Sequence, residues 1–252
     1  FSKPRTRLTE SKNNAEFPSY RGDAINGLDF SKKSRTPNPS RMIKAYEQLA
    51  LCPPDVLPDL ITLFNKTAIE VCEGQQMDMD FETRELVNQE EYIQMIKLKT
   101  SVLLGCALEM GAILANSSQR NKSEIYHFGV NIGLAFQIQD DLLDLYGDGE
   151  KVGKQVGGDI LANKNTLLSI MAQSHADEEQ LKELKRLKSE KDTILKINGT
   201  KSIFDELEVK SKCHQVMQDY YQKALNHFNA IQSENKTSAL LYLTQALMKR
   251  DF

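Results

Sequence analysis

The chain has 252 residues, of which 40% are hydrophobic, with a formal net charge of −3 and a pI near 5.9. This is enough for the sizeable core of a soluble globular protein, and the slight acidity argues against a nucleic-acid-binding protein, which needs a concentrated excess of Lys and Arg. Four cysteines without CxxC spacing argue against zinc sites and a disulfide framework, so we expect a reducing cytoplasm. The most apolar run, residues 102–115, contains Glu109 and is shorter than the ~20 residues that span a bilayer, so we expect no membrane anchor.

The distribution of proline separates the chain into two parts. All seven prolines lie at or before Pro58, which predicts that the rest of the chain is helical. Residues 1–40 hold four of them, few large apolar side chains and an excess of basic over acidic groups. We therefore expect residues 1–40 to be disordered or loosely packed, and residues 41–252 to form an all-α domain.

Apolar residues recur at helical spacing in the second part. Pro58 suits the first turn of a helix, and Asn88 followed by Glu91 resembles a capping pair. The glycine-rich stretch 146–159 predicts a loop. The helices we expect begin near Arg41 and then cover about 58–78, 88–115, 123–146, 165–173, 177–191, 202–232 and 237–250.

The segment FQIQDDLLD, residues 136–144, puts three aspartates into an apolar helical run. Asp140 and Asp144 project from one face, and Asp141 is rotated by about 100°. Like charges in this arrangement repel, most strongly beside apolar neighbours, so a positive group should lie between them. Oxygen ligands suit a hard cation such as Mg²⁺, which takes one or two carboxylates and completes its shell with water and phosphate oxygens. A solvated acidic surface is the alternative from these residues alone.

Lysines near this segment could bind the phosphates that such a metal carries. Gln137 lies on the face of Asp140, and Lys154 and Lys164 follow in or just after the glycine-rich loop. The glycines would let the loop backbone approach a ligand closely, although a plain flexible connector would also contain them.

Two polar pairs lie upstream of the acidic segment. Gln75 and Asp78 are three residues apart near the end of one helix, and Lys99 and Thr100 lie inside another. Lysine is rarely buried in a helix interior unless it is paired, so Lys99 points either to solvent or toward an anion.

These motifs, taken in order, resemble those of the trans-isoprenyl diphosphate synthases, the farnesyl and geranylgeranyl diphosphate synthase family. The resemblance covers about residues 41–252 and rests on GQQMD at 74–78, KT at 99–100, FQIQDDLLD at 136–144, GK at 153–154, and GGDI and NK through 164. It implies an all-α isoprenoid-synthase-like helical bundle around a central cavity, usually a homodimer. The implied reaction is the Mg²⁺-assisted condensation of isopentenyl diphosphate with an allylic diphosphate.

The resemblance also implies a role for each matching residue. The metal-binding set would be Asp140, Asp141 and Asp144. The lysines on the allylic diphosphate would be Lys99, Lys154 and Lys164. The groups near the developing carbocation would be Gln137 and the backbone around Lys99 and Thr100, and the cavity wall would be supported by Gln75 and Asp78.

The family's first Asp-rich motif is not found in this sequence, where Asp140 and Asp141 are the only adjacent aspartates. The bundle is therefore expected to be N-terminally incomplete and to oligomerise or aggregate through uncovered apolar faces. Two alternatives stay open: a non-catalytic or truncated subunit that dimerises with a complete synthase, and, less favoured by the KT and GK motifs, a terpene cyclase.

Overall fold

A computed structural model describes residues 39–147, 156–232 and 238–249 of the chain. Contacts within the chain separate residues 1–47 from residues 48–252, and each unit is considered by itself. In the first unit the structure describes only the start of helix α1 (Pro39–Leu49). Most of the segment 1–40 lies outside the described residues, so its expected disorder stays a prediction.

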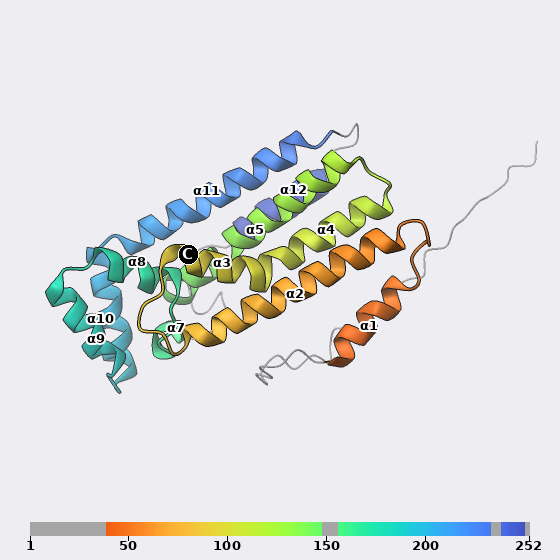
Figure 1. Cartoon of the computed structure of the whole chain (residues 1–252). Helices are drawn as coiled ribbons and strands as arrows, with labels where there is room; N and C mark the ends of the chain where they lie inside the picture. Colours follow the sequence, from red (N-terminus) through yellow and green to blue (C-terminus); the bar gives the residue numbers. More distant parts are fainter. Residues whose placement is uncertain (1–38, 148–155, 233–237, 250–252) are drawn as a thin grey trace, which may run out of the picture. The chain divides into compact units, whose positions relative to one another are not determined.

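The second unit consists of helices, and no strand occurs in the described ranges, which confirms the expected all-α class. Helices α2, α4, α5 and α11 run side by side, and α12 also contacts α5 (Figure 1). No helix among the described residues is both long and apolar enough to cross a lipid bilayer. The helices of this bundle are α2 (Leu57–Phe81), α3 (Gln89–Ile96), α4 (Val102–Leu114), α5 (Gln119–Tyr146), α11 (Val209–Ala230) and α12 (Ser238–Met248).

Helix α5 is the centre of the core. It contacts α4 on one side and α11 on the other, and much of its length is buried. Gly105 of α4 and Gly129 of α5 face each other so closely that a Cβ on Gly129 would lie 2.8 Å from the Cα of Gly105. The two glycines therefore allow the α4 and α5 backbones to approach closely, which fixes the position of α5 in the bundle.

The expected helix 88–115 is present, but a π-helical turn interrupts it. Asn88 and Glu91 form a complete capping box at its start. The turn, Lys97–Ser101, connects α3 to α4 and carries the KT motif. Gly74 of α2 packs against the backbone of this turn. A Cβ added to Gly74 would overlap the backbone nitrogen of Lys99 and lie 2.7 Å from the carbonyl carbon of Leu98. The glycine of GQQMD thus holds α2 against the turn that positions Lys99.

This contact predicts opposite effects for two glycine-to-alanine substitutions. Gly74→Ala should destabilise the protein by about 1–3 kcal/mol, since the added methyl group meets backbone that cannot move aside. Gly111→Ala in α4 is the control: nothing lies within 4 Å of its Cβ position, so we expect a gain of about 0.5–1 kcal/mol. Urea denaturation midpoints measure both, and a Gly74→Ala variant as stable as the wild type would disprove the close contact.

Further helices close one end of the bundle. They are α7 (Gly158–Leu161), α8 (Leu167–His175), α9 (Glu178–Lys188) and α10 (Thr193–Glu206), with α9 and α10 grouped at the left of Figure 1. The single helix expected over 202–232 was wrong, because α10 ends at Glu206 and α11 begins at Val209. Glu208 between them has φ 54°, a left-handed conformation that breaks the helix and that glutamate rarely adopts.

Candidate functional site

The acidic segment lies near the carboxyl end of α5, and its three aspartates differ in environment. Asp140 and Asp144 are partly exposed, whereas Asp141 is 7% exposed. The helix predicts this difference, because Asp140 and Asp144 share one face and Asp141 points toward the core. The structure therefore separates one buried carboxylate from two that solvent can reach.

Asp141 accepts two hydrogen bonds inside the protein. The hydroxyl of Tyr92 on α3 donates to its Oδ2 at 2.5 Å, and the backbone N–H of Leu167, the first residue of α8, donates to the same oxygen at 3.2 Å. Burial raises the pKa of Asp141 to about 7, although both hydrogen bonds act to lower it. Burial and the Asp141 charge raise the pKa of Tyr92 well above its usual value. The phenol therefore stays protonated and acts as the hydrogen-bond donor. Asp141 thus joins α3, α5 and α8.

Asp144 is hydrogen-bonded to the end of the glycine-rich stretch. The Asp159 N–H donates to Asp144 Oδ2 at 2.9 Å, and the Gly157 N–H donates to the Asp144 carbonyl oxygen at 2.6 Å. Gly157 has φ 78°, and a Cβ on Gly158 would lie 3.2 Å from Asp144 Oδ1. A left-handed glycine and a close backbone approach are what the GGD sequence allows here. The returning chain is therefore fastened to α5.

Lys164 lies beside this contact. Its ammonium forms an ion pair with the Asp159 carboxylate. Burial acts to lower the pKa of Lys164, but the pair with Asp159 and the charges of Asp144 and Asp141 outweigh it and raise the pKa. Lys164 is thus a firmly protonated cation near the acidic segment, held by an aspartate that we did not predict as a site residue. The GGDI motif was the signal that could have identified Asp159.

Lys99 points toward an anion, the Asp78 carboxylate, which was one of the two orientations predicted from the sequence. Its Nζ lies 2.7 Å from Asp78 Oδ2, so the pair joins the π-helical turn to α2, with both side chains about one third exposed. The charge of Asp78 also acts on Tyr92: burial and the charge of Asp141 raise the pKa of Tyr92 most, and Asp159 and Asp78 raise it further.

The remaining predicted site residues are placed less completely. Gln75 on α2, Thr100 in the π-helical turn and Gln137 on α5 are all partly buried. Lys154 lies outside the described residues. The roles assigned to these four residues stay predictions.

The donor chemistry of the segment fits a magnesium ion that is shared with phosphate groups. Within the described ranges, no three His, Cys, Asp or Glu side chains form a ready-made metal site. Mg²⁺ does not require one, because it usually binds one or two carboxylates and retains water or phosphate oxygens. Asp140 and Asp144 could supply those carboxylates. Asp141 Oδ2 already accepts two hydrogen bonds, which favours a structural role for it.

Comparison with known proteins identifies a shared family. The sequence profile described as Polyprenyl synthetase matches residues 40–207. A short chain isoprenyl diphosphate synthase of Methanocaldococcus jannaschii is 40% identical over 152 residues, which are 60% of this chain and 43% of that protein. A geranylgeranyl diphosphate synthase of Saccharolobus solfataricus is 35% identical over 187 residues, which are 73% of this chain and 56% of that protein.

Solved structures show the same fold. A crystal structure of geranylgeranyl pyrophosphate synthase is 38% identical, with a TM-score of 0.78, and the match covers 85% of this chain and 67% of that one. The geranylgeranyl pyrophosphate synthetase from Pyrococcus horikoshii is 28% identical, with a TM-score of 0.77, over 82% of this chain and 64% of that one. The chain spans roughly half the length of the curated relatives compared here.

Proposed function

Since the chain belongs to the polyprenyl synthetase family, we propose that it acts in prenyl transfer, condensing isopentenyl diphosphate with an allylic diphosphate. The observation that carries this proposal is the grouping of Asp140 and Asp144 on α5 with the Asp159–Lys164 ion pair. Two carboxylates that solvent can reach, next to a protonated lysine, suit a metal-bound diphosphate.

We assign the chain's own residues to three tasks. Asp140 and Asp144 would hold Mg²⁺, which neutralises the diphosphate as its bond to carbon breaks. Asp141, bound by Tyr92 and Leu167, would set the direction of the acidic segment rather than contact the metal. The lysines that bind the diphosphate would be Lys99, Lys154 and Lys164.

The lysines would act as positive charges whose positions are fixed before the reaction begins. Lys164 is held by Asp159, and Lys99 is held by Asp78 on α2. Negative charge grows on the leaving diphosphate, so cations fixed beside it stabilise the transition state more than the ground state. Gln137 and the backbone at Thr100 would face the carbocation, and Gln75 would support the cavity wall with Asp78. We further propose a cytoplasmic homodimer.

The test is a condensation assay with isopentenyl diphosphate, an allylic diphosphate and millimolar Mg²⁺. We expect the purified chain to form prenyl product, and Asp140→Asn to lower turnover by about 100-fold or more, as for the loss of one preorganised electrostatic contributor. Calorimetric titration with Mg²⁺ and inorganic diphosphate should show weaker binding to Asp140→Asn than to the wild type.

One outcome would favour another function, and a second would contradict the role of the acidic segment. Mg²⁺-dependent diphosphate binding without turnover, with activity only after mixing with a complete synthase, would indicate the subunit that dimerises with such a synthase. Equal turnover in the wild type and Asp140→Asn would overturn the role of the acidic segment.

A further inference from the structure

A cavity of about 350 Å³ lies beside the candidate site, between α7, α8, α9 and α10. This volume is within the range of sites that take small molecules. Asp159 and Lys164 are part of its wall, whereas none of the three aspartates of α5 is among the described residues that line it. Helices α9 and α10 contribute Leu181, Leu184, Lys185, Lys188, Lys196 and Phe204. The cavity therefore shares Asp159 and Lys164 with the candidate site, and the aspartates of α5 are not part of its described wall.

Lys196 is the unusual residue of this wall. It is only 6% exposed, and lysine is almost never fully buried unless it is paired. Its ammonium donates to the Lys188 carbonyl oxygen at 3.0 Å, a contact that caps the carboxyl end of α9. An ammonium group has three N–H donors, and no carboxylate of the described residues lies within ion-pair distance of this one. Within the described ranges, this contact therefore leaves the buried ammonium of Lys196 without a carboxylate partner.

Two further lysines add positive charge at the cavity rim. Lys185 and Lys188 come from the last turn of α9 and are exposed. The only acidic partner described for Lys185 is Glu85, at 4.0 Å with both side chains largely exposed, so that pair is weak. Asp159, the other acidic residue of the wall, is already paired with Lys164. Three lysines thus line the space, and the part of the chain that the structure describes provides no strong anionic partner for them.

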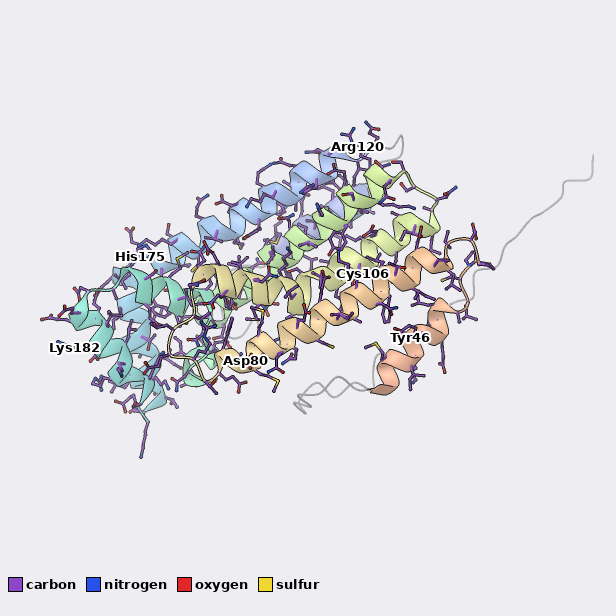
Figure 2. The ribbon with its side chains drawn as sticks, in the orientation of Figure 1. Tyr46, Asp80, Cys106, Arg120, His175 and Lys182 are labelled. Atoms are coloured by element: carbon purple, nitrogen blue, oxygen red, sulfur yellow. The ribbon has the colours of Figure 1, made fainter. Side chains whose placement is uncertain are left out.

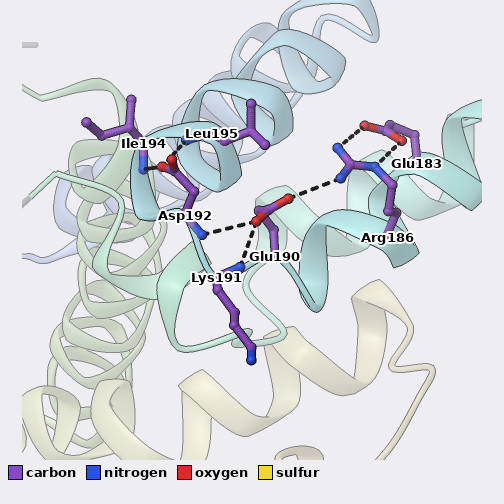
Figure 3. A network of polar contacts seen from close by, with 7 residues as sticks. All are labelled: Glu183, Arg186, Glu190, Lys191, Asp192, Ile194 and Leu195. Carbon is purple, nitrogen blue, oxygen red and sulfur yellow. Dashed lines mark hydrogen bonds and ion pairs between the residues drawn. The ribbon is translucent and has the colours of Figure 1, made fainter.

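The connection between α9 and α10 is ordered by a network of polar contacts (Figure 3). Arg186 bridges Glu183 and Glu190 within and just after α9. Glu190 Oε1 accepts the N–H groups of Lys191 and Asp192, and Asp192 caps α10. The turn is therefore ordered by its own side chains, and the hydrogen bond from Lys196 to the Lys188 carbonyl oxygen connects α10 to the end of α9.

We propose that this cavity binds a small phosphate ester with a short apolar chain, with its phosphate on Lys185, Lys188 and Lys196. The apolar side chains beside the lysines, Leu184 and Phe204, would cover the organic part. The phosphate would give the buried Lys196 ammonium a counter-charge, and each rim lysine would form a charge-assisted hydrogen bond. Isopentenyl diphosphate and other cellular phosphate esters share this chemistry.

The test uses the full chain carrying Asp140→Asn and Asp144→Asn, in a chelating buffer, so that the proposed metal-dependent site is inactive. Calorimetry would compare isopentenyl diphosphate, inorganic diphosphate and glycerol 3-phosphate. We expect isopentenyl diphosphate to bind about tenfold more tightly than inorganic diphosphate, because its carbon chain is buried. Tighter binding of glycerol 3-phosphate than of isopentenyl diphosphate would overturn the apolar requirement, and so would equal binding of inorganic diphosphate.

The lysines are tested with exposed substitutions that should not disturb folding. Lys185→Ala with Lys188→Ala should weaken isopentenyl diphosphate binding about tenfold or more. The matched control removes the same charge from the same region through Lys182→Ala and Lys191→Ala. Lys182 lies on α9, where Figure 2 labels it, and neither control residue lines the cavity. Equal weakening by both pairs, or no measurable binding of any of the three compounds, would overturn the site. Neither readout depends on condensation activity, so failure of the proposed function would leave this result unaffected.

Discussion

Replacing Asp144 with asparagine is expected to lower prenyl transfer by about 100- to 1000-fold while leaving the fold intact. An asparagine oxygen can still accept the Asp159 N–H, so the attachment of the returning chain to α5 is retained. The carboxylate charge, which we propose to hold Mg²⁺, is removed. Turnover and metal-dependent diphosphate binding should therefore fall together, with an unchanged urea midpoint.

Asp144→Ala separates charge from anchoring. It removes the acceptor as well as the charge, so the Asp159 N–H is left without this partner and the ion pair with Lys164 loses its support. We expect the same loss of turnover as in Asp144→Asn, with an additional loss of about 1–3 kcal/mol in stability.

The matched control for both variants is Asp219→Asn on α11. Asp219 is an exposed aspartate that accepts one hydrogen bond, from Gln215 at 2.9 Å, and it lies outside the candidate site. Its activity should equal that of the wild type. Full activity in Asp144→Asn would show that the charge at this position is not required, and would remove Asp144 from the metal site.

Local signals predicted the helices well where they were strong. Asn88 and Glu91 form the capping box that their spacing indicated, and Pro58 lies in the first turn of α2. The break at Glu208 was missed because its cause is a left-handed glutamate, whereas the residues that normally signal such a conformation are Gly, Asn and Asp. The π-helical turn was missed because its packing partner, Gly74, is distant in sequence.

The sequence predicted which residues belong to the candidate site, but not which side chains contact one another there. Helix geometry already placed Asp141 on a different face from Asp140 and Asp144, but only the fold shows that its partner is Tyr92, 49 residues away. Tyr92 itself gave no signal, because an aromatic residue on an apolar helix face usually indicates core packing. The partner of Lys99 was likewise unpredictable from spacing alone, since Asp78 reaches it from a different helix.

Replacing Tyr92 with phenylalanine should therefore have one of the largest effects on stability. The hydroxyl donates to a buried carboxylate, and hydrogen bonds to charged groups contribute about 1.5–3 kcal/mol. In the variant, Asp141 keeps the Leu167 N–H and loses the shorter of its two hydrogen bonds. Phenylalanine fills the same space, so the ring packing of Tyr92 in the core is preserved.

The loss should be larger above neutral pH than below it. Burial raises the pKa of Asp141 to about 7 in the folded protein, well above its value in an unfolded chain. The folded state therefore binds more protons between about pH 4 and pH 7, and stability falls as pH rises through that window. The Tyr92 hydroxyl counteracts this effect by lowering the pKa, so its removal raises the pKa further and costs most when Asp141 is ionised.

Urea denaturation of the wild type and Tyr92→Phe at about pH 5 and pH 8, in chelating buffer, measures this difference. The control is Tyr220→Phe on α11, where a partly buried tyrosine has no hydroxyl partner among the described residues, so its effect should be small and equal at both pH values. A double-mutant cycle with Asp141→Asn should recover most of the Tyr92→Phe loss as coupling energy. A loss that is independent of pH, with no coupling to Asp141, would mean that the phenol stabilises the core by packing alone. The orientation of the acidic segment would then need another cause.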